Sequence, residues 1–149
     1  MPDIHDSATR EAIKRRIGTL RPDSERRWGR MTPDQMLWHC AEGIDAALGR
    51  VPYKAMMKPP PLPKSWIRAL LIGMPWPKGK LQTAPQFVAT ERHDFDAQRS
   101  RLLAGLDQLA ATDPRQAAQV HPIFGANTIG YQSRLAVKHL NHHLTQFGA

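Results

Sequence analysis

Helical periodicity in four separate segments is the feature of this sequence that most limits the folds open to it. Apolar residues recur at three- and four-residue intervals there, and no segment shows the two-residue alternation of a half-buried strand. Each segment has the length and the apolar stripe of a bundle helix. The four expected helices cover residues Ser7–Leu20, Pro33–Leu48, Asp94–Ala111 and Thr128–Gln146. The sequence therefore predicts an all-α fold, a four-helix bundle, with residues 1–149 forming one domain.

Capping residues mark the ends of these helices. Ser7 is the expected cap of the first helix. The second helix has the clearest start, because residues 32–35, Thr-Pro-Asp-Gln, combine a capping hydroxyl, a proline at the first helical position and a glutamine at the reciprocal capping position. Gly49 is expected to end that helix, and either Asn127 or Thr128 caps the last one.

A proline-rich excursion separates the second and third long helices. It extends from Pro59 to Pro85 and surrounds a short apolar stretch, Ser65 to Gly73, which predicts one short helix. A connection of this length inside a compact domain is unusual and is more often functional. We therefore expect the excursion to cover a site as a lid.

Composition argues against several classes of partner. The formal net charge of +8 suggests nucleic acid, but the basic residues are not interleaved with base-stacking aromatics, so we expect an ordinary solvated basic surface and keep nucleic-acid binding as an alternative that rests on charge alone. No apolar run approaches the roughly 20 residues of a membrane span, so we expect no membrane association. The single cysteine, Cys40, excludes an intramolecular disulfide and lies in an apolar pattern as a small buried hydrophobe. This cysteine usage fits a cytoplasmic location.

Histidines form the pattern with the most chemical content. Of the seven histidines, three lie close together in the last expected helix: His139, His142 and His143. Residues four apart on a helix share one face, with Cβ atoms about 5–6 Å apart, so His139 and His143 can reach one metal ion. At about 100° of rotation per residue, these two lie nearer the apolar arc of the helix than His142 does. We therefore expect His142 outside the site or in a second layer around it.

Metal sites in helix bundles draw ligands from facing helices, so a third ligand is needed from elsewhere. His39 is the best candidate, because it falls inside a different core helix, on or next to the face marked by Met36, Cys40 and Ile44. Three neutral imidazoles suit zinc, nickel, iron or copper and leave a position for water or substrate. The alternative is a set of surface or capping histidines near a helix C-terminus, where the dipole favours a partly protonated ring.

Three stretches of the sequence resemble a known family. Residues 27–40, Arg-Trp-Gly-Arg-Met-Thr-Pro-Asp-Gln-Met-Leu-Trp-His-Cys, look like the opening of the second helix in the DinB-like superfamily. A second, quite specific match joins residues 121–125, His-Pro-Ile-Phe-Gly, to residues 138–148, Lys-His-Leu-Asn-His-His-Leu-Thr-Gln-Phe-Gly. A weaker third match is Pro75–Gly79 with Thr83–Pro85. The likeness is greatest to a bacterial branch of the superfamily.

The resemblance implies a bundle with an up-down-down-up arrangement. It also implies a metal site made by one histidine of the second helix and an i, i+4 pair on the last helix. Carried over position by position, these ligands are His39, His139 and His143. The expected cofactor is a divalent metal ion: zinc, nickel or iron. Asn141 stands where the superfamily often has an aspartate, and Tyr131 stands where it commonly has a tryptophan.

Relatives in the superfamily include thiol-dependent S-transferases and isomerases, so the resemblance implies chemistry on a small molecule. In them the metal is thought to lower the pKa of a low-molecular-weight thiol, whose thiolate attacks an electrophile. We therefore expect a metal-dependent transferase acting with such a thiol on a small-molecule substrate, or a hydrolase using metal-bound water. The alternative is a non-enzymatic binding or dimerisation module, assembled as a homodimer, with a vestigial metal site.

Five further side chains are candidates for the surroundings of the site. Tyr131 and Gln35 are candidates for polar contacts to a ligand, and their alternative roles are packing and helix capping. The tryptophans Trp38, Trp66 and Trp76 are candidates for pocket walls, and their alternative role is core or loop packing.

Overall fold

A computed structural model of the chain describes residues 1–54, 58–80 and 83–149. Its elements are the helices α1 (Ser7–Thr19), α2 (Pro33–Ala47), α3 (Lys64–Gly73), α4 (Phe95–Ala111) and α5 (Ile129–Gln146), with a short 3₁₀ helix, η1 (Pro85–Phe87), before α4. The described ranges contain isolated β-bridges but no strand. The predicted all-α fold is confirmed, and α3 is the short helix expected within the proline-rich excursion. None of these helices combines the length and the apolar character that crossing a membrane requires.

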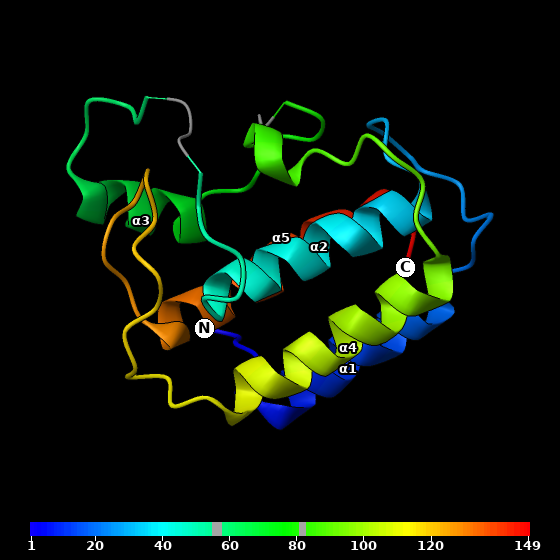
Figure 1. Cartoon of the computed structure of the whole chain (residues 1–149), viewed down its shortest axis with the longest axis horizontal. Helices are drawn as coiled ribbons and strands as arrows, with labels where there is room; N and C mark the ends of the chain where they lie inside the picture. The colour runs from blue at the N-terminus through cyan, green and yellow to red at the C-terminus, as the bar shows by residue number, and fades with distance from the viewer. Residues whose placement is uncertain (55–57, 81–82) are drawn as a thin grey trace.

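Four helices form the bundle, and they run in two opposite directions. In Figure 1, α1 and α5 run one way, and α2 and α4 run the other way. Ion pairs give the register of α2 and α4. Asp34, near the start of α2, pairs with Arg92 just before α4, and Asp45, near the end of α2, pairs with Arg101 further along α4. The two helices are therefore parallel neighbours, and the predicted up-down-down-up bundle is confirmed.

The parallel direction of α2 and α4 explains the long excursion between them. A tight turn joins only antiparallel neighbours, so the chain must return along the whole bundle before α4 begins. Residues 48–94 make this return and carry α3 and η1. Figure 1 shows the excursion over the side of the bundle formed by α2 and α5, away from α1 and α4.

The N-cap of α1 differs from the prediction, and the N-cap of α5 is one of the two predicted candidates. Asp6, not Ser7, caps α1, and its carboxylate accepts a hydrogen bond of 2.8 Å from the backbone N–H of Thr9. A carboxylate at this place satisfies an unpaired N–H and also meets the positive end of the helix dipole, and with Asp6 as the cap Ser7 becomes the first residue of the helix. Thr128 caps α5, which settles the choice left open with Asn127.

Apolar side chains of all four bundle helices form the main core. Those that are fully buried include Ile17, Met36, Leu37, Cys40, Leu102, Leu106, Leu109, Ile129, Leu140 and Leu144. Burying each large side chain of this kind contributes about 1.5–3 kcal/mol. Cys40 is buried as predicted, and its sulfur lies 3.7 Å from the sulfur of Met36. Burial raises the pKa of the Cys40 thiol, so this sulfur is an unreactive core atom.

A second, smaller core joins α3 to the first half of α5. Its buried members are Ile67 of α3, Phe124 of the loop between α4 and α5, and Tyr131 of α5. Arg68 strengthens this contact by donating hydrogen bonds to the carbonyl oxygens of Phe124 and Ala126. The contact fixes α3 against α5 and leaves a space between the excursion and the bundle.

Candidate metal centre

Three histidines from two antiparallel helices converge in the structure. His39 lies in the middle of α2, and His139 and His143 lie on consecutive turns of α5. One ring nitrogen from each lies within 4.8 Å of the other two. The ring centroids are 4.7–4.9 Å apart. The three residues selected from the sequence are therefore close enough to coordinate one ion.

Two hydrogen bonds fix which ring nitrogen faces the centre. The Nδ1–H of His39 donates to the carbonyl oxygen of Phe87 at 2.8 Å, which leaves its Nε2 unprotonated in the neutral ring. The Nδ1–H of His143 donates to Oε1 of Gln146 at 2.9 Å. The amide nitrogen of Gln146 in turn donates to the carbonyl oxygen of Trp28 at 2.7 Å, which orients the amide. Such outer hydrogen bonds are typical of metal-binding histidines.

Burial keeps the three imidazoles neutral. It lowers the pKa of His39, and it lowers the pKa of His143 to about 3, with the neighbouring His39 adding to the effect. The pKa of His139 is also well below its usual range, because of burial and then the three nearby histidines. A metal ligand must be a neutral imidazole, so the pKa shifts favour ligation.

The contact between His39 and His139 brings two donor nitrogens within hydrogen-bonding distance. Their Nε2 atoms lie 2.8 Å apart. Because the ring proton of His39 is on Nδ1, where it is donated to the carbonyl oxygen of Phe87, the Nε2 of His39 presents a lone pair to His139. Nε2 of His139 can carry the ring proton and donate it to this lone pair, which accounts for the distance. In its other tautomer His139 also offers a lone pair, and the three nitrogens then form a donor set of the kind that binds a divalent metal ion.

The loop before α2 lies close to Gln146, the residue that orients His143. Gly29 has φ of +79°, and a Cβ at this position would lie 2.4 Å from Nε2 of Gln146. The backbone N–H of Arg27 donates to the carbonyl oxygen of Gln146 at 2.7 Å. A glycine at 29 therefore allows the loop to approach the residue that holds His143.

A cavity of about 1020 Å³ opens above the three histidines. Its volume reaches the upper end of the usual range for small-molecule sites, about 300–1,000 Å³. The excursion supplies much of its wall, through Pro60, Ile67, Leu71, Trp76, Gly79, Thr83, Ala84, Phe87 and Val88. The lid expected over Pro59–Pro85 is thus a cavity wall in its described part, while residues 81 and 82 lie outside the described residues.

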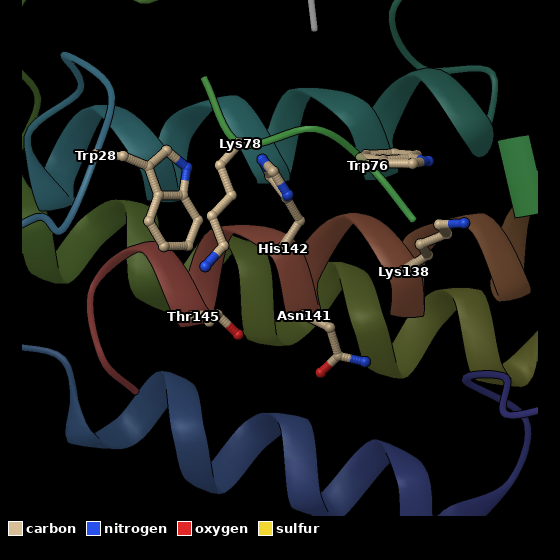
Figure 2. A pocket seen from close by; sticks show the side chains of 7 residues that line it. All are labelled: Trp28, Trp76, Lys78, Lys138, Asn141, His142 and Thr145. Carbon is tan, nitrogen blue, oxygen red and sulfur yellow. The ribbon is translucent and has the colours of Figure 1, made fainter. Parts of the chain in front are cut away.

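A second cavity, of about 260 Å³, lies beside the first. Figure 2 shows its side chains, which come from the loop before α2, the segment after α3 and the exposed side of α5. Trp28, Trp76 and His142 line both cavities. His142 is therefore not one of the three converging rings, as predicted, but it lies at the boundary of the cavities rather than outside them.

The polar candidates Tyr131 and Gln35 have structural roles. The hydroxyl of Tyr131 donates to the carbonyl oxygen of Arg68 at 3.2 Å, within the small core. The side-chain oxygen of Gln35 accepts from the backbone N–H of Thr32 at 3.0 Å, which is the reciprocal half of a capping box. Neither residue lines the cavity above the histidines, so neither is a contact for a ligand there.

Of the three candidate tryptophans, Trp76 alone lines the cavities. Trp38 stacks on His93 with ring centroids 5.0 Å apart, and Trp66 is 63% exposed on α3. Sequence reasoning missed Trp28, which lines both cavities, and Phe87, whose carbonyl orients His39. Trp28 lies in the first stretch that resembles the superfamily, whereas a carbonyl acceptor has no signature in a sequence.

Asn141 lies away from the three converging rings. It accepts a hydrogen bond from Arg16 of α1, so it joins α5 to α1 rather than orienting a histidine. Phe87 and Gln146 orient His39 and His143 instead. Asn141 therefore takes no part in the hydrogen bonds that orient His39 and His143.

Comparison with known proteins places the chain in a family. No curated protein and no solved structure matches it. The family model described as the DinB superfamily matches residues 7–147, which include every bundle helix and all three converging histidines. The chain therefore belongs to the DinB superfamily.

Proposed function

We propose that the protein is a metal-dependent enzyme that uses His39, His139 and His143 to bind one divalent ion. The observation that carries the proposal is the convergence of three neutral imidazoles at the base of a cavity large enough for small molecules. When bound, the ion would supply Lewis acidity that lowers the pKa of a thiol or a water molecule. Zinc, nickel and iron all suit three imidazole donors.

Transfer of a low-molecular-weight thiol is the reaction that the cavity supports best. Activation of water commonly uses a general base within hydrogen-bond reach, most often a histidine and otherwise a carboxylate. Among the described residues that line the cavity there is no aspartate or glutamate, and His121 is engaged by Phe124 and by the N–H of Ile123, so His142 is the candidate base there. A thiolate needs no such base at the moment of attack, since its proton has already gone to solvent. In the transfer, its sulfur bonds to an electrophilic carbon, and the leaving group departs with the electron pair.

In this proposal the side chains of the protein hold the metal ligands in place and exclude water, and none of them reacts with the substrate. Phe87 and Gln146 hold the rings of His39 and His143 in one tautomer, so that the nitrogens facing the cavity stay unprotonated. Trp76 is fixed by a hydrogen bond of 2.9 Å from its indole N–H to the carbonyl oxygen of Leu71. This ring and the other apolar walls exclude water from the reacting groups.

Metal content is the first test. Protein purified without a histidine tag is compared, by elemental analysis, with His143→Ala and with the neighbouring control His142→Ala. We expect near-stoichiometric metal in the wild type and in His142→Ala, and loss of most of it in His143→Ala, because two imidazoles hold a metal far less tightly than three. Equal metal in all three proteins would contradict the assignment of ligands.

Activity is tested next with several cellular thiols and a generic electrophile such as chlorodinitrobenzene. Turnover that disappears on chelation and in His143→Ala supports thiol transfer. Hydrolysis of an activated ester that does not depend on a thiol would contradict thiol transfer and support a hydrolase instead.

The second candidate function is non-enzymatic association as a homodimer. Its support is α3 with its C-cap residue Met74: Trp66, Leu70 and Met74 are 63%, 44% and 56% exposed. Contiguous exposed apolar residues often mark an interaction surface. This candidate treats the histidines as vestigial, so it requires a wild-type protein that purifies without metal and gains none on titration.

A further inference from the structure

The two cavities meet between a pair of tryptophans. Figure 2 shows His142 and Lys78 between the indoles of Trp28 and Trp76. The ring of His142 lies 5.8 Å from each indole centroid. Since these three aromatic residues line both cavities, a molecule bound above the histidines can extend outward between the indoles.

The lining of the two cavities has one sign of charge. Arg30, Lys78 and Lys138 contribute cations to it. No aspartate or glutamate contributes to either lining in the described part of the chain, although the sequence contains 13 of them. A recess with low-dielectric walls and charges of one sign concentrates ligands of the opposite sign.

Lys78 is the cation best placed to meet a ligand. Its ammonium lies 4.8 Å from the ring centroid of Trp28, and no carboxylate of residues 1–54, 58–80 and 83–149 forms an ion pair with it. Lys138 is engaged differently, because its ammonium donates to the carbonyl oxygens of Ile72 and Met74 at the end of α3. Lys78 therefore keeps donors available for an incoming group.

Two neighbouring indoles alone would also suit a cationic ligand. Here the ammonium of Lys78 already lies over the ring of Trp28. The ammonium of Lys138 lies 5.7 Å from the ring centroid of Trp76. Both cations would repel a positively charged ligand, so the indoles favour an apolar body and the lysines favour an anionic group.

We propose that the substrate class of this protein is small organic anions with an apolar body. Lys78 receives the anionic group between Trp28 and Trp76, and the apolar body occupies the large cavity above the three histidines. The inference rests on the proposed function, because it assigns a substrate class to the same cavity. The anionic group is recognised by its charge, so a carboxylate serves as its representative.

The test compares two probes of nearly equal shape, phenylbutyrate and its neutral amide, phenylbutanamide. Their affinities are measured by calorimetry on metal-free protein, so the result does not depend on a bound metal. We expect the carboxylate to bind the wild type roughly tenfold more tightly than the amide, with a preference that weakens as salt is added. In Lys78→Gln the preference should disappear, and in Lys78→Glu it should reverse.

Lys80→Gln is the matched control, because Lys80 is an exposed lysine of the same segment that lines neither cavity. It removes the same charge and should keep the tenfold preference. Equal affinity for both probes, binding of neither, or a preference that survives in Lys78→Gln would each overturn the inference. A preference seen only in metal-loaded protein would assign the anion to the metal and would also overturn it. Metal content, measured on the same preparations, tests the proposed function separately.

Discussion

At the scale of single residues, the acceptors behind the histidines define the site as much as the histidines do. His39 and His143 each donate their Nδ1–H to an oxygen that does not titrate near neutral pH, a carbonyl in one case and an amide in the other. Both rings therefore keep one tautomer over a wide pH range. Neither acceptor was identified from the sequence, because a backbone carbonyl has no residue signature and Gln146 resembles any polar residue near a helix end.

Gln146 provides a test of this view. Gln146→Met keeps the side-chain length and removes the acceptor, so we expect metal affinity to fall about 10–100-fold while the fold is retained. Competition with a coloured chelator measures the affinity, and circular dichroism checks the helix content.

Gln146→Glu is the matched variant, because its carboxylate still accepts from Nδ1 of His143. Its metal affinity should exceed that of Gln146→Met and lie closer to that of the wild type. If the two variants lose affinity equally, the hydrogen bond to His143 has no orienting role.

At the scale of the elements, a polar contact fixes the parallel pair α2 and α4. The buried carboxylate of Asp34 accepts from the guanidinium of Arg92 and from the backbone N–H of His93 at 2.8 Å. Burial alone would raise the pKa of Asp34, but these hydrogen bonds outweigh it and hold the pKa well below its usual value. The start of α2 and the segment that leads into α4 are thus held together by one ionised group.

Asp34→Asn tests this contact. Because the folded state lowers the pKa of Asp34, its stabilising effect is present above the unfolded value of about 4 and is lost as pH falls below it. We expect the variant to lower the free energy of unfolding by about 2 kcal/mol at pH 7, a loss that shrinks below about pH 4. Urea denaturation at several pH values measures both effects.

Asp23→Asn serves as the control, because Asp23 and its partner Arg21 are both 77% exposed. Exposed pairs contribute little, so this change should stay within about 0.5 kcal/mol at every pH. A similar loss in both variants would show that burial of Asp34 is not the source of its effect.

The helices were the part of the structure that the sequence predicted best. Apolar periodicity located every bundle helix to within a few residues, since a buried stripe has to recur at the period of the helix. It failed at the cap of α1, where Asp6 and Ser7 are both capping residues and only the local geometry separates them. The positions of α3 and η1 relative to α5 depend on packing between distant residues, so the pattern within the excursion could not give them.

At the scale of the whole molecule, the candidate metal centre joins the two helices that the excursion covers. His39 belongs to α2, the other two histidines belong to α5, and the described part of the excursion supplies much of the wall above them. A bound ion would therefore cross-link elements about 100 residues apart in the sequence.

Removal of metal should lower the stability of the entire chain. A ligand that binds the folded state alone adds about 2.7 kcal/mol when its concentration is one hundred times its Kd. We expect zinc to raise the thermal midpoint of the stripped wild type by several degrees and to leave that of His143→Ala unchanged. Calorimetric scans of both proteins, with and without zinc, provide the measurement. An equal rise in both would point to nonspecific binding.

Because α2 and α4 are parallel, the residues that form the bundle core and many of those that line the cavity lie in different parts of the chain. The return path between them is obligatory for the topology, yet the four bundle helices make their own core without it. Substitutions in the described part of the excursion that spare Phe87 should therefore alter which molecules the cavity accepts, while the three imidazoles on α2 and α5 and the bundle core keep their places.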